Sequence, residues 1–89
     1  MKVVFRSSFL RDLKKIHDQK VLIRIKKAIE EAENASSFTQ INHVGKLSGA
    51  EDLYRIRLGE YRIGLVLAGD TLEFIRCLHR REIYHYFPY

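Results

Sequence analysis

The stretch LYRIRLGEYRIGL, residues 53–65, predicts two short β-strands joined by a tight turn. Polar and apolar residues alternate before Gly59, which is the pattern of a strand with one buried face. Gly59-Glu60 is a two-residue loop with glycine first, and such a loop suits a type II′ turn and fixes the hairpin register. This register sets Arg57 directly opposite Arg62, a pairing of like charges that sheets usually avoid.

A second loop of the same kind, Gly69-Asp70, extends the hairpin into an antiparallel meander. The strands are expected at residues 53–58, 61–68 and 71–78. Alternation assigns their side chains to two faces. The face expected to pack beneath the helices carries Tyr54, Ile56, Leu58, Tyr61, Ile63, Leu65, Leu67, Leu72, Phe74 and Leu78. Arg76 also falls on this face, so either its side chain reaches out at the sheet edge or a bulge shifts the alternation.

The other face of the meander gathers the arginines. It carries Arg55, Arg57, Arg62, Gly64, Val66, Thr71, Glu73, Ile75 and Cys77, and continued alternation adds His79. Register across the second loop sets Ala68 opposite Thr71, Arg62 opposite Cys77, and Tyr61 opposite Leu78. Arg57, Arg62 and His79 should therefore meet at one end of this face, and Gly64 should leave a floor without a side chain.

Two interpretations of the arginine-rich face are open. Dispersed charge on a solvated sheet face is one, although such faces normally mix Thr, Lys and Glu. Three arginines on neighbouring strands, with no carboxylate directly opposite, are more typical of a phosphate site, because the guanidinium fork matches phosphate oxygens.

The rest of the chain predicts helices and one further strand. Residues 2–5 form a β-branched and aromatic run expected to join the sheet edge. A first helix is predicted by the apolar spacing of Phe9, Leu10, Leu13 and Ile16, with Ser7 or Ser8 as its cap. A second helix is predicted by the spacing of Leu22, Ile25, Ile29 and Ala32. It is expected to be capped by Asp18 and to end at Asn34. The tail is expected to form a short helix ended by Pro88. Residues 35–52 show no period and should contain a short element or carry function.

These elements predict one α+β domain over residues 1–89, in the order β-α-α-β-β-β-α. Its antiparallel sheet should carry a helical hairpin packed on one face. The 46% hydrophobic content argues against a disordered chain, and the net charge of +5 favours a polyanionic partner, either nucleic acid or an acidic protein. We expect a cytoplasmic protein, since no stretch resembles a signal peptide or a membrane span and Cys77 is the single cysteine.

Three motifs, LYRIRLGEYRIGLVL, KLSG at 46–49 and HRREIY at 79–84, together resemble the RelE/ParE superfamily of type II toxins. The element order agrees with this family over essentially the whole chain. RelE-like members are ribosome-dependent mRNA endonucleases that an antitoxin holds inactive, and ParE-like members poison gyrase instead. The resemblance implies a metal-independent endoribonuclease without a cofactor. It also implies two partners, a cognate acidic antitoxin and the ribosomal A site with its mRNA.

The resemblance also assigns roles to residues. It implies that Arg62 binds the scissile phosphate, that Arg80 is a second catalytic arginine, and that Tyr84 lies near the nucleophilic 2′-hydroxyl. Arg55 and Arg57 match positions that contact mRNA. Lys46, which matches the basic position of the KLSG motif, and Arg81 in HRR are expected to bind RNA as well.

The roles of His79 and Tyr84 have alternatives. As an imidazole, His79 suits either proton-transfer role, but it would equally orient Arg80 or cap the last strand. Tyr84 would either act in catalysis or pack as an anchoring aromatic side chain. Two other functions are also open, a ParE-like gyrase inhibitor and a decayed toxin that only binds an antitoxin. No His, Cys, Asp or Glu cluster in the sequence has metal-ligand spacing.

Overall fold

The computed structural model describes residues 1–47 and 52–87. The last two residues of the KLSG motif and the expected helix end at Pro88 lie outside this range. The chain forms β1 (Lys2–Phe5), α1 (Ser7–Lys14), α2 (Gln19–Asn34), a 3-10 turn η1 (Phe38–Gln40), β2 (Val44–Lys46), β3 (Leu53–Leu58), β4 (Tyr61–Ala68), β5 (Thr71–His79) and α3 (Ile83–Tyr86). The predicted α+β class is confirmed, and the element order agrees except that β2 is an additional strand before the meander. The segment 35–52 contains the expected short elements, η1 and β2.

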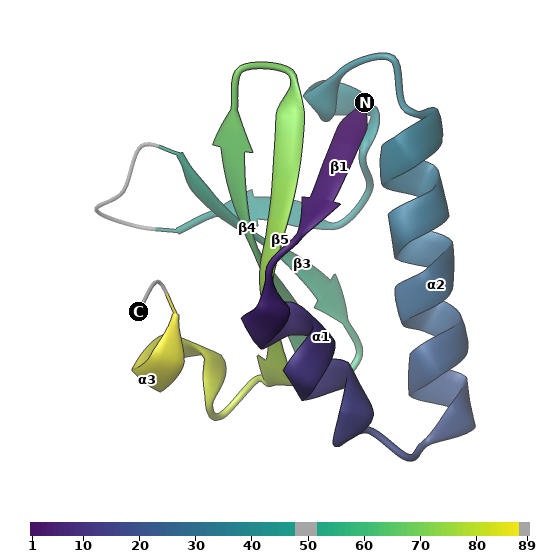
Figure 1. Ribbon diagram of the computed structural model, residues 1–89, viewed down its shortest axis with the longest axis vertical. Helices are drawn as coiled ribbons and strands as arrows, with labels where there is room; N and C mark the ends of the chain where they lie inside the picture. The colour runs from purple at the N-terminus through teal and green to yellow at the C-terminus, as the bar shows by residue number, and fades with distance from the viewer. Residues whose placement is uncertain (48–51, 88–89) are drawn as a thin grey trace.

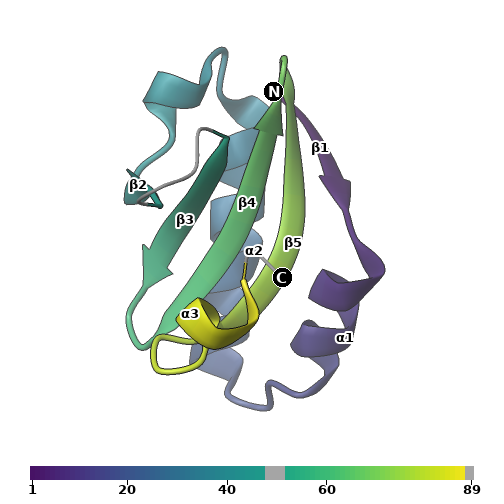
Figure 2. The ribbon, with the colours of Figure 1, turned by 90° about the vertical axis from the view of Figure 1, so that its left-hand side faces the viewer.

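The sheet has five strands in the order β1-β5-β4-β3-β2. Neighbouring strands are antiparallel except for β1 and β5, which are parallel, so the expected all-antiparallel sheet is wrong at this edge. The pair is parallel because β1 feeds the helical hairpin rather than a tight turn. Helix α2 covers one face of the sheet, and the short helix α3 lies on the opposite face (Figures 1 and 2).

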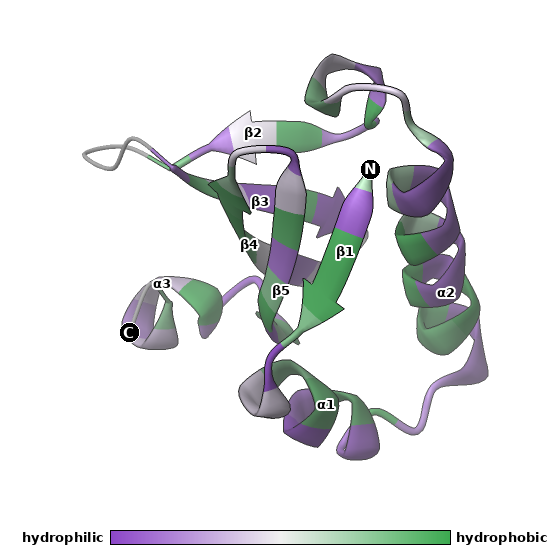
Figure 3. Cartoon of the chain, turned by 45° about the horizontal axis from the view of Figure 1, so that its top comes forward, coloured by the Kyte–Doolittle hydropathy of each residue, from purple (hydrophilic) through white to green (hydrophobic). Residues whose placement is uncertain are grey.

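The core lies between the helical hairpin and the sheet. Its largest side chains are fully buried, namely Phe9, Phe74, Ile25, Ile56, Ile63, Leu65 and Leu72. Phe9 stacks on Phe5 and meets Phe74 edge-on, so α1, β1 and β5 share one aromatic cluster. Hydrophilic and hydrophobic residues alternate along α2 and β3, as expected for elements with one buried face (Figure 3). None of the described helices is long and apolar enough to cross a membrane.

The helix caps agree with the sequence in one case and differ in the other. Asp18 caps α2 as predicted, because its carboxylate accepts a hydrogen bond of 2.9 Å from the Lys20 amide. Helix α1 instead has Arg6 at its N-cap and no side-chain cap. The Ser8 hydroxyl donates to the Ile75 carbonyl at 2.5 Å, so this serine ties α1 to β5.

The register of the β3–β4 hairpin is the predicted one. Arg57 pairs with Arg62, Arg55 pairs with Gly64, and Leu58 pairs with Tyr61. Gly59 has a φ of +61°, the left-handed value that the first loop position of a type II′ turn requires.

The register between β4 and β5 departs from the prediction at a β-bulge. Ala68 lies opposite Thr71 as expected, but Leu65 pairs with Phe74 and Gly64 pairs with Arg76, so Ile75 is the extra residue. Beyond it each side chain changes face.

The bulge corrects three predicted positions. Arg62 pairs with Leu78 instead of Cys77, and Tyr61 pairs with His79 instead of Leu78. Cys77 lies opposite Ile63 and is 2% exposed in the core. Of the two explanations open for Arg76, the bulge is correct.

Candidate functional site

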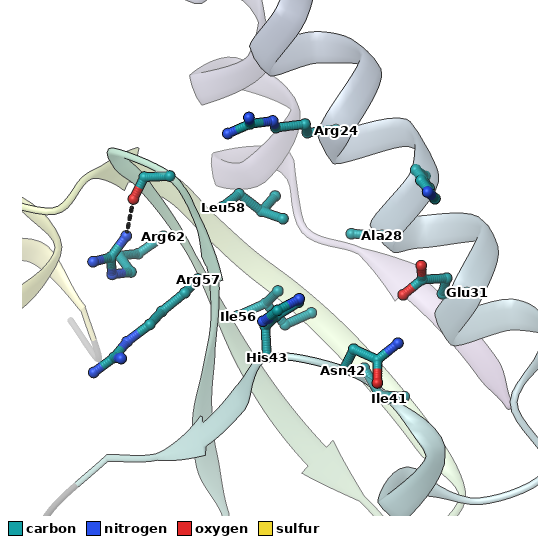
Figure 4. Close-up of a pocket in the computed structure, with 12 residues that line it drawn as sticks. Arg24, Ala28, Glu31, Ile41, Asn42, His43, Ile56, Arg57, Leu58 and Arg62 are labelled. Carbon is teal, nitrogen blue, oxygen red and sulfur yellow. Dashed lines mark hydrogen bonds between the residues drawn. The ribbon is translucent and has the colours of Figure 1, made fainter.

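Arg57 and Arg62 form a cross-strand pair next to the β3–β4 turn, at one end of the sheet. Arg62 Nη1 donates to the carbonyls of Gly59 and Tyr61 at 2.5 and 2.8 Å, so its guanidinium curls back over the turn. Arg57 points away from α2 (Figure 4). Neither arginine has a carboxylate within ion-pair distance among residues 1–47 and 52–87. Both guanidinium groups are therefore available to an anion.

Glu60 attaches the residues that follow β5 to the same turn. Its carbonyl accepts a hydrogen bond of 2.7 Å from the Arg80 amide, and its carboxylate lies 3.0 Å from Arg80 Nε. His79 Nε2 is 3.5 Å from the same carboxylate oxygen, and His79 Nδ1 accepts from the Arg81 amide at 3.2 Å. The sequence analysis missed Glu60, because a loop residue belongs to neither sheet face. Its place in the loop that precedes Arg62 was the available signal.

His79 reaches the site by a different route from the one predicted. It pairs with Tyr61, so the bulge places it on the opposite sheet face from Arg57 and Arg62, and the predicted shared face is wrong. Its ring meets the Tyr61 ring edge-on at 5.8 Å. The contact with Glu60, rather than strand alternation, brings His79 beside the turn.

Arg55 and Lys46 lie away from this turn. The Arg55 guanidinium lies over Gly45 of β2, where an added Cβ would come within 2.8 Å of Arg55 Cζ. Lys46 is exposed and pairs with Tyr54, on the face opposite to Arg55 and Arg57. Arg55 therefore lies on the same sheet face as Arg57 and Arg62, and Lys46 does not.

Gly64 is not an open floor for a ligand. An added Cβ at this position would lie 2.8 Å from atoms of the Phe87 ring, so the ring sits directly on the glycine. Phe87 is 3% exposed, and Ile83 of α3 is fully buried. The expectation of a bare floor is wrong because the C-terminal segment packs into the space that the missing side chain leaves.

A second contact holds α3 in place through a buried ion pair. The Asp12 carboxylate accepts hydrogen bonds from Arg76 Nε at 2.8 Å, from Arg76 Nη2 at 3.1 Å and from the Cys77 amide at 2.9 Å. Arg76 Cζ lies 5.7 Å from the centre of the Tyr86 ring, within cation–π range. The hydrogen bond to Asp12 raises the pKa of Arg76, and burial opposes this only in part. The chain Asp12–Arg76–Tyr86 therefore links α1, β5 and α3.

Tyr84 lies on α3 and is 61% exposed. Arg80 and Arg81 precede the helix in a turn, because α3 begins only at Ile83. Arg80 therefore does not share a helix face with Tyr84.

Comparison with known proteins places the chain in a family. A family model described as ParE toxin of the type II toxin-antitoxin system, parDE, matches residues 3–84. Toxin RelE3 from Methanocaldococcus jannaschii is 46% identical over 91 residues, which cover 99% of this chain and 100% of that toxin. The chain belongs to the RelE/ParE superfamily of type II toxins.

Solved structures of RelE/ParE superfamily proteins agree with the fold. A RelB–RelE antitoxin–toxin complex from Methanococcus jannaschii matches with a TM-score of 0.81 and 42% identity, covering 96% of this chain and 99% of that one. The archaeal RelE–RelB complex from Pyrococcus horikoshii OT3 has a TM-score of 0.70 at 22% identity, covering 89% and 93% of the two chains. The second likeness shows the fold alone. With its RelE relatives, this chain is a RelE-like toxin of a type II toxin-antitoxin family.

Proposed function

We propose that this RelE-like toxin is a ribosome-dependent mRNA endonuclease. One observation supports the proposal above all others, the gathering of Arg57, Arg62 and Arg80 around the β3–β4 turn, where the Glu60 carboxylate pairs with Arg80 alone of the three. Arginine forks bind phosphate oxygens in two-point contacts, and unpaired arginines on facing strands are costly unless an anion joins them. An RNA backbone supplies this anion.

The proposed reaction is an internal transesterification. An RNA 2′-hydroxyl loses its proton and attacks the adjacent phosphorus, and the bond to the 5′-oxygen of the next nucleotide breaks as that oxygen gains a proton. Negative charge builds on the non-bridging oxygens, and Arg62 and Arg80 are assigned to stabilise it. Tyr84 and His79 are assigned to the two proton transfers, and Arg55, Arg57 and Arg81 to holding the message.

A RelE-like activity is favoured over a ParE-like one. The matching family model is named for ParE, but the relative at 46% identity is a RelE toxin over its full length. The chain also carries arginines around the turn, which can bind phosphate, and the exposed Tyr84, which can transfer a proton, as an RNase would require. Gyrase inhibition remains the alternative to be tested.

We also propose an acidic antitoxin as a partner. Two of the structural relatives are described as complexes of RelE with RelB, and this chain carries a net charge of +5. An acidic segment would complement the unpaired arginines. It would either cover their face or displace α3, which is a single short helix.

The function is tested with purified toxin, programmed translating ribosomes and primer extension. New 5′ ends in the message, absent from the same RNA without ribosomes, are expected. A supercoiling assay with gyrase runs in parallel. Gyrase inhibition without new 5′ ends would overturn the RNase proposal in favour of the ParE-like function.

A further inference from the structure

Arg24 reaches the β3–β4 turn from the other side of a groove. It lies on α2, and helical spacing alone places it on the outward face. A Cβ added to Gly59 would lie 2.7 Å from Arg24 Nη1, so the guanidinium occupies the space beside the glycine. Figure 4 shows the side chain extending from α2 across the groove.

Two guanidinium groups therefore approach the backbone of one turn. Arg62 donates to the Gly59 carbonyl, and Arg24 Nη1 lies 2.7 Å from the position that a Cβ on Gly59 would take. Within the part of the chain that the structure describes, neither has a carboxylate within 4.0 Å. Like charges brought to one turn from two elements favour a bound anion, which would relieve their repulsion.

The groove between α2 and β3 continues this positive surface. It has a volume of about 500 Å³. Among the described residues that line it, the other cationic ones are Lys27 and Arg57, whose guanidinium points away from α2, and the one carboxylate is that of Glu31. Its floor is apolar and includes Ile41, Ile56 and Leu58. A positive rim over an apolar floor suits an RNA nucleotide, with phosphate on the arginines and a base face on the aliphatic side chains.

His43 at the groove is held in an uncommon backbone conformation. Its φ is +62°, in the left-handed region that non-glycine residues rarely adopt. Its carbonyl accepts a hydrogen bond of 3.1 Å from the Arg57 amide, and His43 lines the groove together with Ile56. Such conformations are strained and cluster at ligand sites. The turn into β2 thus presents the imidazole to the groove.

We infer that Arg24 and Arg62 together bind a second RNA phosphate, next to the scissile one, and that the α2–β3 groove receives the adjoining nucleotide. The inference rests on the proposed function. It makes Arg24 a substrate-positioning residue that the sequence motifs do not include. The groove is lined by the proposed catalytic residue Arg62 and by Arg57, which is assigned to hold the message, so one RNA strand would contact the groove and the proposed active site without leaving the protein.

The test compares Arg24→Ala with Lys26→Ala, which removes an exposed cation on the same helix beside a different groove. Cleavage of one message in translating ribosomes is measured over a series of salt concentrations. Loss of a charge-assisted contact should raise KM by about tenfold with kcat nearly unchanged. The slope of log affinity against log salt should fall by about 0.7 for one phosphate of a single strand. Lys26→Ala should match the wild type, and Arg24→Lys should recover the salt slope but not the full affinity.

The outcomes separate the inference from the proposed function. If the wild type cleaves and Arg24→Ala equals Lys26→Ala in KM and salt slope, the second phosphate site is overturned alone. If Arg24→Ala cleaves normally but no longer binds the cognate antitoxin, the groove serves an acidic protein and the RNA assignment is wrong. If the wild type does not cleave, the proposed function fails and the inference fails with it.

Discussion

The ring of Phe87 lies directly on Gly64 of β4, and helix α3, which precedes Phe87, lies on the sheet face opposite to helix α2. This contact, with the buried Ile83, fixes α3 against β4 and β5. A glycine in a strand interior is normally a weakness, since it packs nothing itself. Here it makes room for the segment that carries Tyr84.

Gly64→Ala should release α3 from the sheet. An added Cβ at 2.8 Å from the ring cannot be accommodated without moving Phe87, so the free energy of unfolding should fall by about 1–3 kcal/mol. Urea denaturation measures this loss. In a Phe87→Ala background the same substitution should be neutral or slightly stabilising, because alanine is the better strand residue when the ring is absent. Equal losses in both backgrounds would contradict the contact.

Asp12→Asn should destabilise the fold strongly. Asp12 is 5% exposed and carries the two hydrogen bonds from Arg76, so its loss leaves a half-buried cation without an anion. We expect a loss of about 2–4 kcal/mol in chemical denaturation, below the fully buried limit because the Arg76 side chain is 23% exposed. Glu73→Gln is the control, since its exposed pair with Arg6 should contribute less than about 1 kcal/mol. Similar losses in both variants would contradict this role.

The Cys77 thiol should be unreactive in the folded protein. Burial raises its pKa to about 12, with the charge of Asp12 adding to the effect. Iodoacetamide at pH 8 should leave the native protein unmodified and alkylate it quickly in urea. Stability should also fall as pH rises above about 8.5, because only the unfolded chain then loses the thiol proton. Rapid alkylation of the native protein would contradict the core position.

Glu60→Gln should strengthen binding of the message. The carboxylate lies between Arg80 and His79 and competes with phosphate for Arg80, while the backbone hydrogen bond from the Arg80 amide holds the segment without it. We expect a lower KM in translating ribosomes and a steeper salt dependence. An unchanged KM would show that Glu60 does not compete with the substrate.

The sequence predicted the β3–β4 site well because its geometry is local. A two-residue loop with glycine first leaves one register, and that register sets Arg57 opposite Arg62. Strand alternation predicts which sheet face a side chain occupies only while the pairing between strands is regular.

The bulge at Ile75 marks where sequence reasoning failed. One extra residue moved Cys77 into the core and His79 to the opposite face, and nothing in the alternation of β5 locates it. The one sign of the bulge in the sequence was the charge of Arg76 at a position that alternation assigned to the core face. The contacts of Arg24 with Gly59 and of Phe87 with Gly64 were also out of reach, because each depends on how a helix crosses the sheet rather than on spacing along the chain.

The central claim is that Arg62 acts on the phosphate of a ribosome-bound message. Its direct test is primer extension on one mRNA in translating ribosomes with wild type, Arg62→Ala and the control Arg11→Ala, which removes an exposed cation of α1. We predict new 5′ ends with the wild type and Arg11→Ala, and a loss of at least about a hundredfold in cleavage rate with folded Arg62→Ala. Wild-type cleavage by Arg62→Ala, with the fold verified by circular dichroism, would contradict the account.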